Sequence, residues 1–451
     1  MAVLKDCAQF LSALPGIDWG DLYFQRSASR SLSYSDGKVE EVSSSSSAGC
    51  SARLLKGKSS AFAVVSGIER GGAARALGEA SRIAAVRCGS VPDVSFPLER
   101  VQAFFPENVD FFGETDRRLR AECGWIRQIT LSCSANARRY VVVSPEESHA
   151  GEAEHCSFAA EVIVERNGRL ESGYGAFSVS GSARKFFQEL AAENVARRAL
   201  QEALVNLEAV ECPTGAMPVL LSDEAGGTIV HEACGHGMEA DLVFEEQSSF
   251  AGKIGSQVAA EDVTVVDDAS LPGLYGSFAC DDEGTPSRRT VLIERGILKN
   301  YLTDKRCARL YDLPLTGNGR RSSYASLPMP RMSNTFVAEG PREQGEMIQS
   351  VSRGLFVRRM GGGEVNTTTG EFVFDVTQGC LIEDGKITRP VKGASLIGRG
   401  IDALMGIRAV GKRLHMEPGM CEKEGQSLPV TDGQPSLLID GLVVGGTAAD
   451  R

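Results

Sequence analysis

Hydrophobic and polar positions alternate through much of the first half of the chain, as they do in strands with one buried face. The pattern predicts strands at residues 22–26, 32–42, 51–55, 60–65, 139–143, 157–165 and 169–179. Turn residues separate several of them, including Asp36-Gly37 and Arg166-Asn167-Gly168. The serine run at residues 43–47 fits an exposed strand edge or a loop.

Apolar residues at helical spacing predict helices at residues 68–86, 114–134 and 183–207, and a proline-containing loop at residues 95–112. The third helix carries an apolar stripe that is typical of packing onto a sheet. Strands followed by a helix therefore occur twice. We predict two similar halves with a repeated strand–helix layout, within one N-terminal domain of residues 1–212.

Beyond residue 213 the chain is dominated by short strands with glycine-rich turns. We predict strands at residues 217–222 and 262–266 and hairpins within residues 290–302 and 372–383. This pattern indicates a mainly antiparallel β barrel or sandwich over residues 213–451, with one short helix after its first strand. The expected fold class of the whole chain is α+β.

That short helix contains two histidines and a glutamate within six residues, in the run His231-Glu232-Ala233-Cys234-Gly235-His236. Two imidazoles beside a carboxylate are what zinc-dependent hydrolysis requires, although ordinary helix residues are the alternative. The histidines are five residues apart, which separates them by about 140° on a regular α-helix. A single wide turn would realign them, and Gly235 makes such a distortion inexpensive. We therefore expect a helix deformed across residues 233–235.

A catalytic zinc ion needs a third protein ligand and an open position. Glu239, Asp241 and Cys421 are all candidates, and spacing does not choose among them. A buried structural thiol is the default interpretation of any one of the twelve cysteines.

Composition narrows the class of protein. The net charge of −11 disfavours a nucleic-acid-binding surface. The cysteines form no CxxC pair, and the first residues lack the pattern of a signal peptide. No run of about 18 apolar residues indicates a membrane span. We expect a cytoplasmic protein with reduced thiols, which binds neither nucleic acid nor membrane.

The run from His231 to Asp241 resembles the HExxxH signature of the TldD/PmbA family of metallopeptidases, on the TldD side. The resemblance continues through Asp281-Asp282-Glu283-Gly284, Thr316-Gly317-Asn318-Gly319-Arg320-Arg321, Leu327-Pro328-Met329-Pro330-Arg331-Met332, Gly361-Gly362-Gly363, Pro390-Val391-Lys392-Gly393-Ala394, the Cys421 segment and Val443-Val444-Gly445-Gly446-Thr447. It covers nearly the whole second half, and the first half matches more loosely.

The resemblance implies a zinc peptidase with His231, His236 and Cys421 as metal ligands. It implies that Glu232 is the catalytic carboxylate, which would take a proton from metal-bound water and pass it to the leaving amine. It also implies action on unfolded or extended peptides, and a PmbA/TldE-type partner subunit in a heterodimer; a homodimer is the alternative. The rival function is a non-catalytic binding or assembly subunit with a structural metal or none.

Three further motifs allow two interpretations each. Residues 317–321 could offer guanidinium groups to a peptide carboxylate or backbone, or form a solvated or salt-bridged turn. Residues 361–363 fit a turn or bulge better than an edge that holds a peptide by strand addition. Residues 281–283 lack the alternating ligands of a calcium loop and fit a charged turn.

Overall fold

The computed structural model describes residues 2–69, 71–87, 98–107 and 109–447. The predicted loop at residues 95–112 lies partly outside them. Within these ranges the chain is mixed α and β, with sheet predominating. No described helix has the length and apolar character that crossing a membrane would require.

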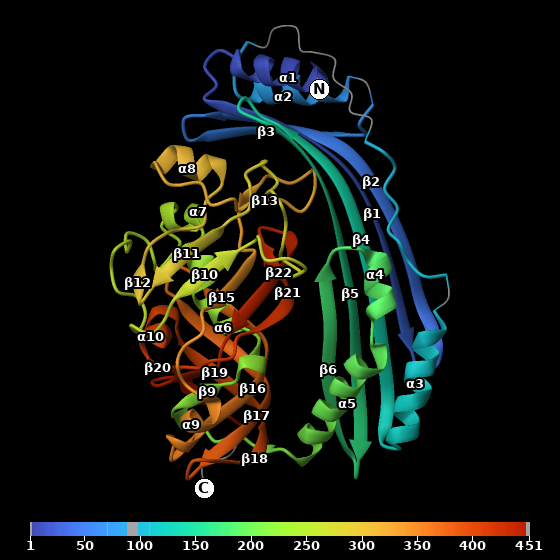
Figure 1. The fold of residues 1–451 in the computed structure, drawn as a ribbon, viewed down its shortest axis with the longest axis vertical. Coiled ribbons are helices and arrows are strands. Elements are labelled where there is room, and N and C mark those ends of the chain that lie inside the picture. Colours follow the sequence, from blue (N-terminus) through green and yellow to red (C-terminus); the bar gives the residue numbers. More distant parts are fainter. Residues whose placement is uncertain (1, 70, 88–97, 108, 448–451) are drawn as a thin grey trace.

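One six-stranded antiparallel sheet, in the order β3-β2-β1-β4-β5-β6, forms most of the N-terminal half. Its strands are β1 (Trp19–Ser35), β2 (Lys38–Lys56), β3 (Ser59–Ser66), β4 (Ile126–Val143), β5 (Ser148–Arg166) and β6 (Arg169–Ser180). Four of these strands are unusually long, and Figure 1 shows the sheet curling along them like half of a barrel. Three strands followed by helices occur twice in this half.

Helices cover both ends of one face of this sheet: α1 (Ala2–Ser12) and α2 (Gly72–Ile83) at one end, and α3 (Asp110–Glu122), α4 (Ala183–Glu189) and α5 (Ala192–Glu208) at the other. Even-numbered β1 residues such as Phe24 and Leu32 belong to these two cores. Glycine residues of β6 let α5 pack closely onto this strand, since a Cβ at Gly173 would lie 2.1 Å from the Ala199 carbonyl oxygen. The opposite face of the sheet turns toward the C-terminal half.

Four predicted elements of this half differ from the structure. The helix expected at residues 114–134 is wrong in its second part, which forms the start of β4. Ile129, Leu131 and Cys133 are buried at every second position, and this period of two decides the conformation. The strands expected at residues 22–26 and 32–42 are parts of β1 and β2, and the third helix is interrupted at residues 190–191.

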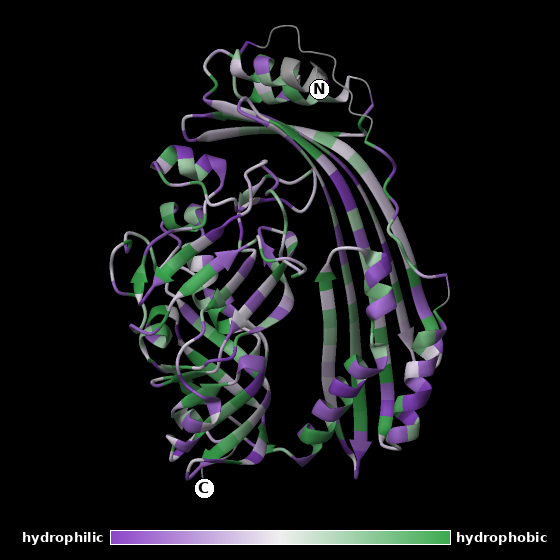
Figure 2. Cartoon of the chain, viewed as in Figure 1, coloured by the Kyte–Doolittle hydropathy of each residue, from purple (hydrophilic) through white to green (hydrophobic). Residues whose placement is uncertain are grey.

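The C-terminal half contains two larger sheets. One has the order β12-β11-β10-β15-β22-β21 and the other β20-β23-β9-β16-β17-β19-β24-β8. The first comprises β10 (Val265–Asp268), β11 (Arg289–Glu294), β12 (Ile297–Leu298), β15 (Asn334–Val337), β21 (His415–Lys423) and β22 (Gln426–Gln434). The second comprises β8 (Gly215–Ala216), β9 (Val219–Leu221), β16 (Arg353–Asn366), β17 (Glu371–Glu383), β19 (Ala394–Arg399), β20 (Ile407–Val410), β23 (Leu437–Ile439) and β24 (Val443–Gly445), and β18 (Lys386–Lys392) joins it beside β7 (Val210–Glu211). Figure 2 shows many strongly hydrophobic residues in these strands, whereas the outer strand β2 is pale along much of its length.

Most strand pairs here are antiparallel, but β9 with β16, β15 with β22, and β7 with β18 are parallel. The hairpin expected within residues 372–383 is wrong, because β17 runs through it as one strand. The turn at Asp384-Gly385 then leads into β18. Register shifts in β16 next to Gly363 show that the glycine run forms a bulge. The proposed domain boundary near residue 212 remains a prediction.

Short helical turns between the two C-terminal sheets carry the residues of interest. They are α6 (Thr228–Val230), η2 (His231–Gly235) and η3 (His236–Met238), followed by α7 (Ala240–Phe244). Val230, Cys234 and Met238 lie in one core with residues from both sheets. The remaining described helices are η1 (Asp223–Ala225), α8 (Lys305–Tyr311), α9 (Gln344–Gln349) and α10 (Gly400–Met405), with a small pair of strands, β13 (Gly319–Arg320) and β14 (Met329–Pro330).

Buried ion pairs join the two halves. Arg53 of β2 contacts Asp21 at 2.6 Å and also contacts Glu283, and the three side chains are almost fully buried. Arg138 of β4 lies 3.0 Å from Asp282. The acidic run at residues 281–283 is therefore a turn, as predicted, but a buried one that holds the N-terminal sheet.

Candidate metal centre

The helix that carries both histidines is widened by one residue. Residues 231–235 form a π-helical turn, in which the backbone N–H of His236 donates to the carbonyl of His231. The imidazole rings consequently lie on the same side, with centroids 5.0 Å apart and planes at 90°. The expected deformation of the helix is confirmed. A glycine suits position 235, because a Cβ there would lie only 2.1 Å from the Met332 sulfur.

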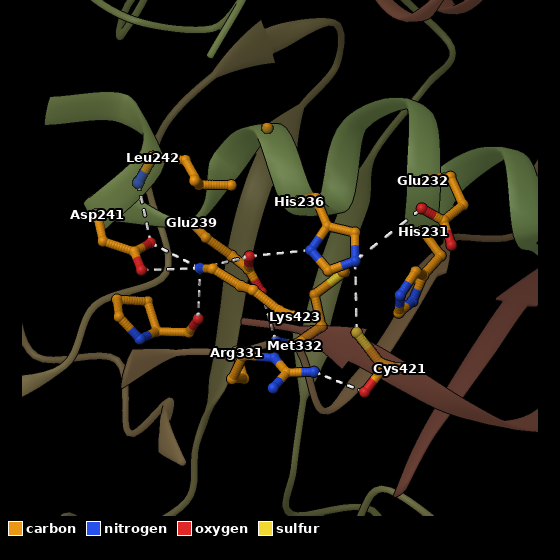
Figure 3. Close-up of polar contacts among 12 residues, drawn as sticks. His231, Glu232, His236, Glu239, Asp241, Leu242, Arg331, Met332, Cys421 and Lys423 are labelled. Atoms are coloured by element: carbon orange, nitrogen blue, oxygen red, sulfur yellow. Dashed lines mark hydrogen bonds and ion pairs between the residues drawn. The ribbon is translucent and has the colours of Figure 1, made fainter. Parts of the chain in front are cut away.

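A sulfur atom from the end of the chain completes this cluster. Cys421 Sγ lies 3.4 Å from His236 Nε2 (Figure 3), and one donor atom each from His231, His236 and Cys421 lies within 4.8 Å of the others. Strand β21 brings the thiol here through its pairing with β22, in which Cys421 lies opposite Leu428. Arg331 stabilises this position by donating to the Cys421 carbonyl at 2.7 Å.

Each imidazole is oriented by a carboxylate on its other nitrogen. His231 Nδ1 lies 2.7 Å from Asp432 Oδ1, and His236 Nδ1 lies 3.0 Å from Glu239 Oε2. The Nε2 atoms remain for a ligand. Carboxylate partners of this kind are the usual supports of metal-binding histidines, because they fix the tautomer and the ring plane.

Glu239 and Asp241, the other candidate ligands, have different roles in this geometry. Glu239 is fully buried behind His236 and also bonds Lys423 Nζ at 2.9 Å. Asp241 bonds the same ammonium group at 2.8 Å (Figure 3). Burial would raise the pKa of Glu239, but Lys423 and His236 lower it to about 2. Glu239 thus stays charged and supports His236 instead of joining the donor cluster.

The three donor residues form a strongly polarised group. Burial acts to lower the pKa of both imidazoles, but Asp432 and Cys421 raise that of His231 well above its usual value, and Glu239 and Cys421 raise that of His236 to about 9. Burial would raise the pKa of the Cys421 thiol, but His231 and His236 lower it to about 6. Without a metal ion the two imidazoles therefore hold their protons tightly, whereas the thiol loses its proton readily; the carboxylates and the thiolate favour positive charge at the centre, which a divalent cation can supply.

The donor set fits zinc. Tetrahedral zinc with usual Zn–N and Zn–S bond lengths places a ligand nitrogen about 3.6 Å from a ligand sulfur. The 3.4 Å between Cys421 Sγ and His236 Nε2 is close to this separation. Two imidazoles and one thiolate are also ligands that zinc prefers. Three protein donors among the described residues leave a fourth position open.

Glu232 lies beside the cluster without joining it. Its Oε2 is 4.0 Å from His236 Nε2, and its side chain is 29% exposed, whereas the two imidazoles are buried. A carboxylate near the donors and open to solvent can exchange protons with a molecule bound there.

A cavity of about 540 Å³ reaches this region from the N-terminal sheet. Its lining combines Tyr174 and Ser157 of the sheet with Gly226, Met420 and Asp432 of the C-terminal half. The space between the two halves therefore extends to the carboxylate that orients His231.

The sequence did not reveal Asp432 or Lys423. Asp432 is 201 residues from His231 and precedes a glycine, a pair that ordinarily indicates a turn. Lys423 lies two residues from Cys421 on the same face of a strand, which is a usable signal only once Cys421 is known. Arg320 and Arg321 are buried, so a solvated turn is wrong for them, but Arg321 lies 3.5 Å from Asp21, as the salt-bridged alternative expects.

Comparison with known proteins places the chain. A family model described as the PmbA/TldA metallopeptidase C-terminal domain matches residues 214–446, and one described as PmbA/TldA metallopeptidase domain 1 matches residues 20–84. The protein named "Metalloprotease TldD homolog" of Haemophilus influenzae is 39% identical, covering 96% of this chain and 93% of its own. A Saccharolobus solfataricus protein named "Zinc metalloprotease TldD homolog" is 31% identical over 55% of this chain and 56% of its own.

The fold also agrees with a solved structure. The crystal structure of TldE from Thermococcus kodakarensis matches with a TM-score of 0.71 at 19% identity, covering 97% of this chain and 100% of that one. Because sequence similarity to the Haemophilus relative extends over nearly the full length, the chain belongs to the PmbA/TldD family of metallopeptidases.

Proposed function

We propose that this chain is a zinc-dependent peptidase that hydrolyses peptide bonds in unfolded or extended peptides. The observation that carries the proposal is the convergence of His231, His236 and Cys421, with the Glu232 carboxylate beside them. Cys421 comes to the two histidines from 185 residues beyond His236. His231, His236 and Cys421 would hold the ion. When bound, zinc would polarise the scissile carbonyl and acidify water.

The residues of the chain provide the remaining chemistry. Asp432 and Glu239 keep the two imidazoles in the tautomer whose Nε2 faces the centre. Glu232, adjacent to a ligand, would accept a proton from water and deliver it to the leaving amine. Its partial exposure suits this exchange, since a fully buried carboxylate would not meet substrate or solvent.

The shape of the access route supports an extended substrate. The cavity beside Asp432 measures about 540 Å³ and lies between the N-terminal sheet and the C-terminal half. Even a 100-residue domain has a radius of gyration of about 13 Å and could not enter such a space. A single peptide strand can.

Replacing Glu232 with Gln tests the proposal. The variant should keep its zinc and lose cleavage of a denatured protein by about 100-fold or more, because proton transfer by a positioned side chain commonly contributes that much. Cleavage is followed by mass spectrometry of the released peptides, and zinc by elemental analysis. Glu245→Gln, at an exposed site directly after α7, is the matched control. Undiminished cleavage by Glu232→Gln contradicts the assignment. A zinc-loaded parent that cleaves nothing, alone or with a partner, favours the rival binding or assembly role.

The proposal includes a partner: a TldE-type subunit in a heterodimer, with a second copy of this chain as the alternative. Both edges of the long sheet support it. Strand β3 covers β2 only from Gly49 onward, and the uncovered part exposes Val42 at 69%. At the other edge β6 exposes Leu170 at 60%. Exposed strand edges with apolar side chains are suited to pairing with another chain. Native mass spectrometry of the chain alone, and mixed with a TldE-type protein, distinguishes the two assemblies from a monomer.

A reducing cytoplasmic location completes the proposal. The described cysteines other than Cys7 are free thiols. Free buried thiols and a zinc-binding thiolate are best preserved in a reducing compartment.

A further inference from the structure

A second cavity, separate from the donor cluster, lies between the same two halves. We name it the arginine pocket; it measures about 330 Å³, and its lining includes Gln25, Asn136, Arg138, His155, Arg320 and Met420. The other lining residues are small, hydroxyl-bearing or apolar. None of the described residues that line it carries a carboxylate.

Arg320 gives the pocket a positive charge without an ion-pair partner. Its guanidinium is 4% exposed and donates to the carbonyls of Met332 and Pro429. Within the described chain no carboxylate lies at ion-pair distance from it. Burial and Arg331, with Arg138, lower the pKa of Arg320 to about 10 although the more distant Asp282 and Asp267 act to raise it, and Arg320 stays charged at neutral pH.

Arg138 adds a second guanidinium whose bonding capacity is not exhausted. One of its terminal nitrogens lies 3.0 Å from Asp282, while its Nε has no hydrogen-bond partner in the described structure. Gln25 is 3% exposed, and its buried Oε1 likewise has no partner. Buried polar groups are normally satisfied, so the unpaired donor of Arg138 and the unpaired acceptor of Gln25 point to a ligand that brings both an acceptor, such as a carboxylate oxygen, and a donor, such as a peptide N–H.

His155, which lines the same cavity, carries no charge. Burial, Arg138 and Arg320 together lower its pKa to about 3, so the imidazole is neutral. A neutral imidazole can donate a hydrogen bond to an anion without adding charge.

The arginine pocket adjoins the 540 Å³ cavity that is lined by Asp432, the carboxylate behind His231. Tyr275 and Met420 line both cavities, and Met420 directly precedes Cys421. From these two residues the 540 Å³ cavity continues to Asp432, which orients His231. A ligand in the arginine pocket could therefore be one end of a chain that passes toward the centre.

We propose that the arginine pocket binds a carboxylate group of the peptide substrate, with Arg320 and Arg138 as the recognising residues. Guanidinium groups bind carboxylates by charge-assisted hydrogen bonds, which are about twice as strong as neutral ones. The group is either the C-terminal carboxylate or an acidic side chain. This inference rests on the proposed peptidase function, because the substrate class follows from it.

Calorimetric binding of three peptides to zinc-loaded Glu232→Gln protein tests the proposal. The probes are acetyl-tetra-alanine with a free C-terminus, the same peptide as its amide, and an amidated peptide with glutamate at the third position. A carboxylate-bearing peptide should bind about tenfold more tightly than the uncharged amide, as one charge-assisted contact predicts. Preference for the free acid identifies the C-terminus, and preference for the glutamate peptide identifies a side chain.

Two variants locate the effect in the pocket. Arg320→Gln should abolish the preference, and Arg408→Gln, which removes an exposed arginine elsewhere, should keep it. Asn136→Asp is the second variant: the position is exposed, so folding is not at risk, and the added charge should repel the carboxylate. Gln349→Glu on α9 is its control.

Equal binding of all three peptides by the Glu232→Gln protein overturns the proposal. A preference for carboxylate-bearing peptides that survives both Arg320→Gln and Asn136→Asp also overturns it, because the carboxylate would then be bound by the zinc. Binding is measured without turnover. Failure here is therefore distinguishable from a parent enzyme that does not cleave peptides.

Discussion

The carboxylate of Asp432 lies 2.7 Å from Nδ1 of His231, although the two residues are 201 positions apart. This contact joins strand β22 to the π-helical turn and leaves Nε2 of the imidazole for the centre. Glu239 does the same for His236 at 3.0 Å. The orientation of both rings is thus set by the protein, so loss of either carboxylate should weaken metal binding.

Asp432→Ala should lower zinc affinity by about 10- to 100-fold, the usual effect of removing a carboxylate behind a metal-binding histidine. Competition with a chromophoric chelator measures this affinity. Asp375→Ala, at an exposed position of β17, should leave it unchanged. If the Asp432→Ala protein competes with the chelator for zinc as well as the parent protein does, His231 needs no carboxylate behind it to bind the ion.

Lys423→Met should destabilise the metal-free protein by about 3–5 kcal/mol at pH 7, because it leaves buried Glu239 and Asp241 charges without their cation. Urea unfolding measures the change, and Lys386→Met on exposed β18 provides the control. A loss below about 1 kcal/mol would show that the ion pairs are not coupled to folding.

The same variant should change the pH dependence of stability. The pKa of Glu239 is about 2 in the folded chain against a usual 4.5, so its contribution is complete above about pH 4.5 and is lost as the pH falls toward 2. Without Lys423 the folded-state pKa rises and this contribution shrinks. The difference between parent and Lys423→Met should therefore be smaller at pH 4 than at pH 7. A constant difference would argue against a charged Glu239.

Gly400→Ala should disturb the π-helical turn. A Cβ at Gly400 would lie 2.0 Å from the Ala233 carbonyl oxygen, and backbone cannot yield as a side chain can. We expect a loss of about 1–3 kcal/mol in unfolding free energy together with weaker zinc binding. Gly362→Ala meets no atom within 4 Å and should be neutral. A Gly400→Ala protein with normal stability and zinc content would contradict the tight fit.

Alkylation should distinguish Cys421 from the other thiols. Its pKa of about 6 makes it a thiolate in metal-free protein at neutral pH, so its iodoacetamide labelling should rise between pH 5 and 7. Zinc should protect it. Cys380, whose pKa is raised by burial, should label slowly with or without zinc. Peptide mapping by mass spectrometry separates the two, and labelling of Cys421 that ignores zinc would remove it from the metal centre.

The sequence predicted local features better than long-range contacts. The spacing of His231 and His236 predicted the widened turn, because the geometry of a helix fixes where residues five apart must point. The start of β4 was mistaken for a helix because the apolar residues within 114–134 also fit helical spacing. Packing against α3 and α5, which buries every second residue of the strand, is what distinguishes the two. The curl of the long sheet has no local signal, since it arises from the twist of whole strands.

The site divides in the same way. The residues Glu232 and Cys421 followed from a motif and a family resemblance, whereas the partnership of Asp432 with His231 depends on the parallel pairing of β15 with β22. The buried ion pairs at residues 281–283 were hidden for the same reason: an acidic run on its own is ordinarily solvated.

X-ray absorption at the zinc K edge of the zinc-loaded chain tests the central claim most directly. The proposed centre predicts one sulfur at about 2.3 Å and two imidazole nitrogens at about 2.0–2.1 Å, with the sulfur lost in Cys421→Ser. A spectrum with no sulfur in the parent protein, or one that Cys421→Ser leaves unchanged, would contradict the account.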